Sequence, residues 1–184
     1  MKRLALALAV TGLCASAIVV PATPVAALET YEAQLAASDA ASQARVDMLD
    51  AFGPKPLKPG QYLWRTVPES AGRERVVISL SDQLAFLYRG NTLMAVATIS
   101  SGEPGRDTPT GIFAVRGKKP MHRSRKYDNA PMPFAQFIDE YGIALHAGYN
   151  PGRPASHGCV RLPSAFAKKL YTVTDIGTPV IIGA

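Results

Sequence analysis

Short runs of alternating or β-branched residues dominate the chain after residue 73, and they limit the fold more than any other feature. Four follow one another closely: RVVISLS, QLAFLYRG, NTLMAVATIS and GIFAVRG. Such alternation and such side chains are typical of β-strands. Turn-forming pairs, Ser81-Asp82 and Gly90-Asn91, separate the first three runs. We therefore expect an antiparallel meander.

The rest of this region adds strands and one helix. Further strands are expected at residues 134–138, 142–148 and 178–184, and residues 118–133 are expected to form a polar loop long enough to cover a site. A short helix is expected in PSAFAKKLYTVT, where Pro163 and Ser164 suit the first turn. Many short strands with one late helix predict a mainly β fold, a β-sandwich or barrel-like domain.

The amino terminus has the pattern of a secretory signal peptide. Lys2 and Arg3 precede an apolar run of 17 residues, after which PATPVAALET turns polar. Small residues suit cleavage after Ala26 or Ala27, so residues 1–27 are predicted to be removed. Retention as an anchor helix stays open, because a 17-residue run is at the short end of what spans a bilayer.

A helix is expected next, over residues 28–52, which are rich in Ala, Gln and Glu and contain no Gly or Pro. Gly53-Pro54 ends it, and GPKPLKPG predicts a stiff linker. The larger apolar residues of the helix fall on one face: Leu28, Tyr31, Leu35, Val46 and Leu49.

These features divide the mature chain into a helix with a Pro-rich linker (28–72) and a main domain (73–184). Whether the helix regulates access to a site, mediates assembly or does neither stays open. We expect a monomer.

Charge and cysteine content restrict the partners. The formal net charge is +6, and loss of Lys2 and Arg3 with the signal peptide lowers it to +4. This balance suits an anionic polymer such as cell wall, whereas the basic and aromatic interleaving of a nucleic-acid surface is missing from the sequence.

Loss of Cys14 leaves Cys159 alone, so it has no disulfide partner in the mature chain. A lone thiol in an oxidising compartment is buried, paired with another chain, or reactive.

His146 is the residue best placed to activate that thiol. In GIALHAG, strand alternation puts His146 on the face opposite Leu145, and only ten residues separate Gly148 from Cys159. A base beside a thiol generates the thiolate that attacks a carbonyl. Gly158 would let backbone amides approach the resulting oxyanion. From spacing alone, a buried structural thiol stands level with this catalytic interpretation.

The longer pattern HAGYNPGRPASHGCVRLP, with DTPTGIF and NAPMPF upstream, closely resembles the L,D-transpeptidase catalytic domain, or YkuD domain, over residues 73–184. The resemblance is to a short-loop subgroup carrying HAG and PASHGC. It implies that Cys159 is the nucleophile and His146 the general base and acid. The other signature positions are filled by Ser156, His157, Gly158 and Arg161. In this family His157 would shape the oxyanion pocket, and Arg161 would hold a substrate carboxylate or brace the loop.

The resemblance also implies a substrate, a peptidoglycan tetrapeptide stem cut between its diamino acid and the terminal D-Ala. The acyl group would rest on Cys159 and pass to an amine, giving a 3-3 crosslink or anchoring an envelope protein, or to water. Tyr127 and His122, in the predicted loop, are implied substrate contacts. No cofactor is implied, and the implied location is the periplasm or cell envelope. Nothing in the sequence distinguishes the acyl acceptors.

Two other functions remain as alternatives. His146, His157 and Cys159 could supply three zinc ligands, but the His-x-Cys spacing is poor for chelation and no HExxH-type motif is present. A non-catalytic wall-binding protein would need Cys159 only as a buried thiol. In EPGRDTPTGIF, Asp107, Thr108 and Thr110 are expected to fix a turn by local hydrogen bonds.

Overall fold

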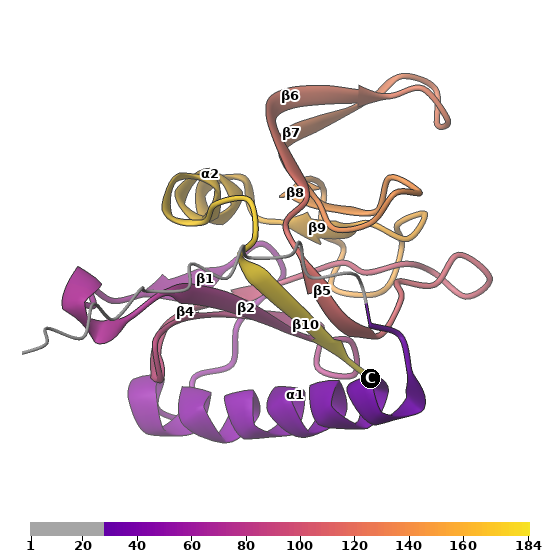
Figure 1. The fold of residues 1–184 in the computed structure, drawn as a ribbon. Helices are drawn as coiled ribbons and strands as arrows, with labels where there is room; N and C mark the ends of the chain where they lie inside the picture. Colours follow the sequence, from indigo (N-terminus) through magenta and orange to yellow (C-terminus); the bar gives the residue numbers. More distant parts are fainter. Residues whose placement is uncertain (1–27) are drawn as a thin grey trace, which may run out of the picture.

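Two β-sheets and two α-helices make up residues 28–184, the part of the chain that the computed structural model describes (Figure 1). The predicted signal peptide and its cleavage site lie outside the described residues. The helices are α1 (Tyr31–Phe52) and α2 (Ser164–Val173), with a short 3-10 turn at Glu69–Ala71. The strands are β1 (Tyr62–Trp64), β2 (Glu74–Ser79), β3 (Leu84–Arg89), β4 (Thr92–Thr98), β5 (Gly111–Ala114), β6 (Gly117–Ser124), β7 (Ala130–Phe137), β8 (Ala144–Ala147), β9 (Val160–Leu162) and β10 (Pro179–Gly183). The predicted mainly β fold with an early and a late helix is confirmed.

The larger sheet contains the predicted meander. Its six strands lie in the order β1-β4-β3-β2-β10-β5, and β2, β3 and β4 pair antiparallel in sequence order. The fourth predicted run, β5, is not part of the meander. It pairs antiparallel with the C-terminal strand β10, which itself lies parallel to β2. Because β10 has buried residues along its length, it inserts between β2 and β5 instead of adding to an edge.

The smaller sheet, in the order β6-β7-β8-β9, corrects the prediction of a polar loop over residues 118–133. These residues form most of a β-hairpin, in which β6 and β7 pair from Gly117↔Phe137 to Ser124↔Ala130. The hairpin projects from the rest of the molecule (Figure 1). Every residue of β6 is exposed or half-buried, so its sequence KKPMHRS has no buried face and lacks the alternation by which strands are recognised.

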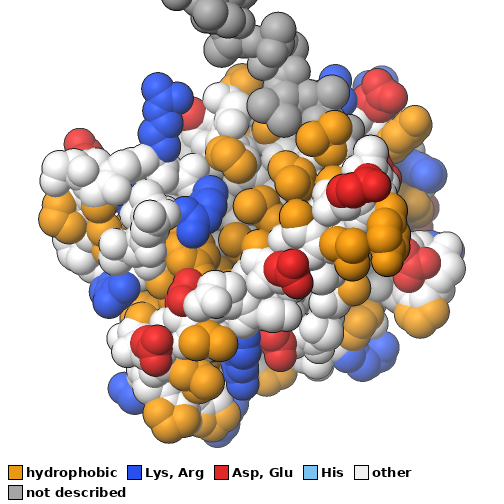
Figure 2. Space-filling model, turned by 60° about the horizontal axis from the view of Figure 1, so that its bottom comes forward, with side chains coloured by type: hydrophobic (Ala, Val, Ile, Leu, Met, Phe, Trp, Pro, Cys, Tyr) orange, Lys and Arg blue, Asp and Glu red, His pale blue; other side chains and the backbone are white. Residues whose placement is uncertain are grey.

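Helix α1 is present as predicted, and the face that carries its larger apolar residues is the exposed one. Its buried residues are Ala33, Ala37, Ala41, Ala44 and Met48. The predicted apolar face is 43–71% exposed at Leu28, Tyr31, Leu35, Val46 and Leu49. Figure 2 brings the underside of Figure 1 forward, and hydrophobic side chains are visible there among charged ones.

Close approach between α1 and β10 explains why the alanine face packs. A Cβ atom built on Gly183 of β10 would lie only 2.4 Å from the carbonyl oxygen of Ala37. At such a separation only small side chains fit between helix and sheet. Farther along the helix, the hydroxyl of Tyr88 on β3 donates a 2.6 Å hydrogen bond to Asp47. The helix is thereby fixed on one face of the six-stranded sheet.

The main hydrophobic core lies on the opposite face of that sheet. Phe113 of β5 and Phe166 of α2 are fully buried in it, and the Phe166 ring contacts those of Tyr62 and Trp64 at centroid distances of 5.8 and 5.9 Å. Leu145 of β8 belongs to the same core. Strands β8 and β9, which flank the candidate site, therefore pack on the main hydrophobic core. Within residues 28–184, neither helix is both long enough and apolar enough to cross a membrane.

Candidate active site

Parallel pairing of β8 with β9 brings His146 and Cys159 to the same face of the smaller sheet. The register places His146 opposite Arg161, and Cys159 lies two residues before Arg161. Side chains two apart point to the same side of an extended chain. Leu145 and Val160, on the other side, enter the main core. The predicted alternation in GIALHAG is confirmed.

A cavity of about 430 Å³ opens over this face. Seven of the eight residues named from the sequence line it: His122, Tyr127, His146, Ser156, His157, Cys159 and Arg161. The β6–β7 hairpin supplies one wall of the cavity, and β8, β9 and the loop between them supply others. The eighth residue, Gly158, is not part of the lining. The structure thus gathers residues from three separate segments around Cys159.

The thiol and the imidazole are each held by a backbone carbonyl. The Cys159 Sγ atom lies 3.7 Å from the Gly142 oxygen, and His146 Nδ1 lies 2.8 Å from the Ala147 oxygen. Because a carbonyl can only accept, Nδ1 carries the hydrogen of the neutral ring and Nε2 is left as an acceptor. No direct hydrogen bond joins the thiol to the imidazole within the described part of the chain.

Burial keeps both groups uncharged. It lowers the pKa of His146 below 6.5, the Ala147 carbonyl opposes this shift, and the Arg161 charge adds to it. Burial raises the pKa of the Cys159 thiol above 9.0, partly offset by a backbone hydrogen bond to Ala144. Asp139 raises the thiol pKa further and Arg161 lowers it. At neutral pH the pair is a thiol beside a neutral imidazole.

The turn before Cys159 is braced by two hydroxyl groups. Ser156 Oγ donates to the Cys159 carbonyl and accepts the Gly158 N–H at 3.1 Å. Thr108 Oγ1 donates to the Gly158 carbonyl at 2.8 Å and accepts the Gly102 N–H at 2.9 Å. The Gly158 N–H is therefore engaged inside the turn.

Gly158 is required by the conformation of this turn. Its φ angle is +112°, and a Cβ atom there would lie 2.6 Å from the Ile143 Cδ1 atom. Both the left-handed backbone and the lack of space favour glycine.

Asp139 holds the turn that precedes β8, and no role was predicted for it. One carboxylate oxygen, Oδ1, accepts the N–H groups of Tyr141, Gly142 and Ile143 at 3.0, 2.8 and 2.8 Å. This fixes the carbonyl of Gly142, which the thiol contacts. An Asp followed by a Gly-containing turn is a common signal for such a motif. The predicted local hydrogen bond of Thr108 is confirmed by its contact with Gly102, and Thr108 also bonds to Gly158, 50 positions away.

The remaining predicted residues are held in different ways. The rings of Tyr127 and His157 stack at a centroid distance of 4.2 Å, and His157 Nε2 lies 3.9 Å from Glu103 Oε1. His122 meets the Phe137 ring edge-on at 5.1 Å. The aliphatic part of Arg161 covers Gly148, where a Cβ atom would lie 3.0–3.2 Å from it.

The cavity carries positive charge. Arg125, Lys126 and Arg161 line it, and no Asp or Glu side chain is among the described lining residues. Such a lining favours a ligand with carboxylate groups. Within residues 28–184, no three His, Cys, Asp or Glu side chains are grouped so that they could hold a metal ion.

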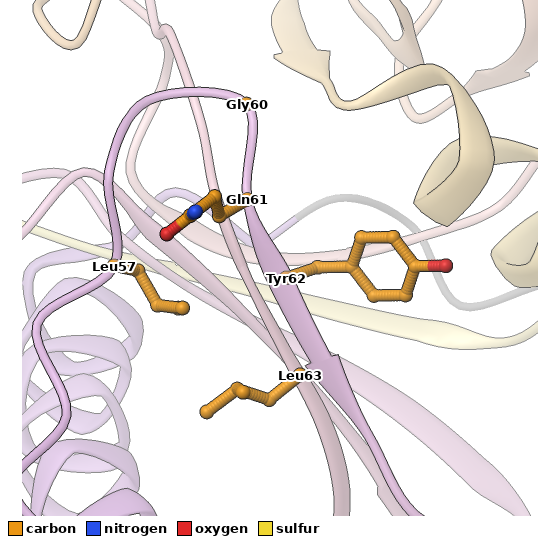
Figure 3. A pocket seen from close by; sticks show the side chains of 5 residues that line it. All are labelled: Leu57, Gly60, Gln61, Tyr62 and Leu63. Atoms are coloured by element: carbon orange, nitrogen blue, oxygen red, sulfur yellow. The ribbon is translucent and has the colours of Figure 1, made fainter.

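A second hollow, of about 410 Å³, lies at the start of β1 and has no such chemistry (Figure 3). It is lined by Leu57, Gly60, Gln61, Tyr62 and Leu63. In Figure 3 the Tyr62 side chain points to the opposite side of the strand from Leu63. With no nucleophile, base or charged group in its lining, this hollow offers no candidate reaction.

Comparisons with known proteins agree with this fold. A family model described as YkuD, the L,D-transpeptidase catalytic domain, matches residues 73–182. An L,D-transpeptidase from Mycobacterium smegmatis is 22% identical with a TM-score of 0.56, over 61% of this chain and 59% of that one. An L,D-transpeptidase from Stackebrandtia nassauensis is 22% identical with a TM-score of 0.57, over 76% and 66%.

A third solved structure is L,D-transpeptidase 3 from Mycobacterium tuberculosis in complex with a faropenem-derived adduct. It is 22% identical with a TM-score of 0.56, over 61% of this chain and 60% of that one. The chain therefore spans less than two thirds of the length of each of these structures. At these identities the structures support the fold, and the comparison with curated proteins gives no match. The family model covers more than half of the chain, and the protein belongs to the L,D-transpeptidase catalytic domain (YkuD) family.

Proposed function

We propose that the protein is a cysteine L,D-transpeptidase that acts on peptidoglycan stem peptides. The observation that carries the proposal is that His146 on β8 and Cys159, directly before β9, line a single positively charged cavity. The Ala147 carbonyl orients the imidazole so that Nε2 is the free acceptor. A nucleophile, an oriented base and a cationic binding site are the parts that acyl transfer needs.

In the first half-reaction the thiol turns from the Gly142 carbonyl and gives its proton to His146 Nε2. The Sγ atom then attacks the carbonyl carbon between the diamino acid and the terminal D-Ala. A C–S bond forms, and the carbonyl electron pair moves to oxygen. Collapse breaks the C–N bond, the imidazolium protonates the leaving amine, and D-Ala departs from a thioester on Cys159.

The oxyanion is stabilised by donors at the signature turn. Ser156 engages the Gly158 N–H, so we assign this role to the Cys159 backbone N–H, with His157 shaping the pocket. Loss of one such donor typically costs about 3–4 kcal/mol of barrier. His122 and Tyr127 contact the stem from the hairpin. Arg161 braces the loop, in keeping with its packing on Gly148.

In the second half-reaction an amine attacks the thioester carbonyl, His146 takes its proton, and the C–S bond breaks to restore the thiol. An amine on a second stem gives a 3-3 crosslink, and an amine on an envelope protein anchors it. Water in place of the amine makes the protein an L,D-carboxypeptidase. Together with the predicted signal peptide, a peptidoglycan substrate supports export of the protein to the periplasm or cell envelope.

The release of D-Ala from a tetrapeptide stem tests the proposal. We expect release by the wild type and none by Cys159→Ala. Iodoacetamide should abolish release, whereas a strong chelator should leave it unchanged, because the thiol and not a metal activates the carbonyl. Loss of activity with the chelator would support the zinc hydrolase instead. Full activity of Cys159→Ala would contradict the proposal and favour a wall-binding protein.

A further inference from the structure

Two tyrosines at the mouth of the cavity have no partner within the described residues. Tyr141 is 81% exposed and Tyr149 is 79% exposed, and both line the cavity that contains Cys159. Neither ring stacks on another aromatic ring or under a cation. Tyr127 differs, because its ring is already stacked on His157. Large aromatic surfaces left in water beside a cavity are typical of binding sites.

The backbones that carry these exposed rings are firmly held. Asp139 accepts the N–H of Tyr141 itself and those of the next two residues. Beside Tyr149, the buried Asn150 donates from Nδ2 to Thr98 at 3.2 Å and accepts the Gly152 N–H at 2.8 Å. Each tyrosine is therefore presented by an ordered loop, which reduces the entropy lost when a ligand binds.

Both rings are close in sequence to the reacting groups. Tyr141 precedes Gly142, whose carbonyl oxygen lies 3.7 Å from the thiol. Tyr149 follows His146 by three residues. Tyr141 and Tyr149 form the rim of the cavity. An acyl group that is bound to Cys159 and is longer than the cavity must extend over this rim.

The chemistry of the rim differs from that of the wall. The hairpin and β9 contribute the positive charges of Arg125, Lys126 and Arg161, which suit carboxylates. The rim contributes two uncharged aromatic rings, with the exposed carboxylate of Glu140 next to one of them. A pyranose ring suits such a surface, since its C–H-rich face packs on an aromatic ring while its hydroxyl and acetamido groups remain hydrated or reach a carboxylate.

We infer that Tyr141 and Tyr149 form a saccharide-stacking subsite for the amino-sugar glycan to which the stem peptide is attached. This inference rests on the proposed function, because it identifies the larger substrate from which the stem enters the site. It adds a second class of ligand, an uncharged glycan, to the anionic peptide.

Two substrates that differ only in sugar test the subsite. One is the free tetrapeptide, and the other is the same tetrapeptide on its N-acetylglucosaminyl–N-acetylmuramyl disaccharide. For Tyr141→Ala and Tyr149→Ala, kcat/KM should fall about three- to tenfold with the disaccharide substrate and change less than about twofold with the free peptide. Tyr141→Phe and Tyr149→Phe should keep both activities, since the ring is retained.

Tyr31→Ala is the matched control, because Tyr31 is also exposed, at 71%, but lies on α1. It should change neither activity. Equal losses on both substrates would overturn the subsite and indicate that the rings contact the peptide or only support their loops. Unchanged activity of the Tyr141→Ala, Tyr149→Ala double variant on the disaccharide substrate would also overturn it.

Binding of a peptide-free glycan separates failure of the subsite from failure of the proposed function. In the Cys159→Ala background, NMR titration with the uncharged tetrasaccharide of N-acetylglucosamine should shift resonances at residues 139–150. Adding Tyr141→Ala and Tyr149→Ala should remove the shifts. If neither peptide substrate reacts but the shifts are seen, the transpeptidase proposal fails and the glycan subsite stands. If no shifts are seen, the subsite is wrong even when the enzyme is active.

Discussion

His146 and His157 line the same cavity as Cys159, and their surroundings give them different capacities. His146 is buried, and its Nδ1 atom is tied to a carbonyl, which leaves Nε2 as a proton acceptor. His157 precedes the cysteine by two residues, but its ring is stacked on Tyr127 and its Nε2 atom faces Glu103. A base must be neutral and free at one nitrogen, so we assign this role to His146.

Replacing each histidine by glutamine separates these roles. His146→Gln should lower kcat/KM for D-Ala release about 10²- to 10⁴-fold, the usual contribution of a general base. His157→Gln should lower it by about tenfold or less, because the amide retains a polar group at the oxyanion pocket. Both variants should be checked for unchanged thermal unfolding. The reverse order of effects would assign the base to His157.

The charge state of the resting pair gives a pH dependence. Burial lowers the pKa of His146 and raises that of Cys159. The imidazole therefore stays neutral as the pH falls through 6.5, and kcat/KM should decline only below that value. The thiol stays protonated until the pH exceeds 9.0, so alkylation by iodoacetamide should be slow near neutral pH and accelerate only in alkaline solution.

A thiolate–imidazolium pair at rest would give a different profile. Alkylation would then reach a plateau already in weakly acidic solution, and His146→Gln would remove the plateau. That observation would contradict the neutral pair.

Among the secondary-structure elements, α1 depends most on close packing. Ala41 is 2% exposed, and a Cβ atom on Gly183 would lie 2.8 Å from its Cβ atom. Ala41→Leu should therefore lower the free energy of unfolding by about 1–3 kcal/mol through overpacking. Ser42→Leu, on the exposed side of the helix, should change it by about 0.5 kcal/mol or less.

Chemical denaturation of both variants measures this difference directly. Similar stabilities would mean that the alanine face does not pack tightly on β10. D-Ala release should be unchanged in both, since α1 contributes no residue to the lining of the cavity.

The packing of α1 also shows why its orientation could not be predicted from residue type. Tyr31, Leu35, Val46 and Leu49 are more hydrophobic than the alanines that are buried. The buried face is decided by the distance between helix and sheet, which depends on Gly183 at the other end of the chain. The β6–β7 hairpin escaped prediction for a related reason, because backbone pairing holds it together without a buried face on β6.

Over the whole molecule, the local parts of the site were predictable and the long-range supports were not. The residues next to Cys159 and the facing direction of His146 follow from the short pattern and from strand alternation. Thr108 acts on Gly158 through a contact that only the folded chain creates. Asp139 bonds only to residues two to four positions away, so its role could have been read from the local Asp-Gly turn. The strand order of the larger sheet likewise depends on insertion of β10 beside β2.

Stability and substrate binding depend on different parts of the molecule. One face of the six-stranded sheet is covered by α1, and the other carries the core on which β8 and β9 rest. The cavity is formed by the smaller sheet, its hairpin and the loops around Cys159. The loops can vary in sequence without disturbing the core. We therefore expect substrate preference to be changed by substitutions in the hairpin and rim, and stability by those at the α1–β10 contact.

Mass spectrometry of the acyl-enzyme tests the central claim most directly. The wild-type protein is mixed with a tetrapeptide stem, quenched in acid and weighed intact. Its mass should increase by that of the tetrapeptide minus that of the released D-Ala, and proteolysis should place the adduct on Cys159. An adduct that persists in Cys159→Ala, or D-Ala release by the wild type with no thioester, would contradict the account.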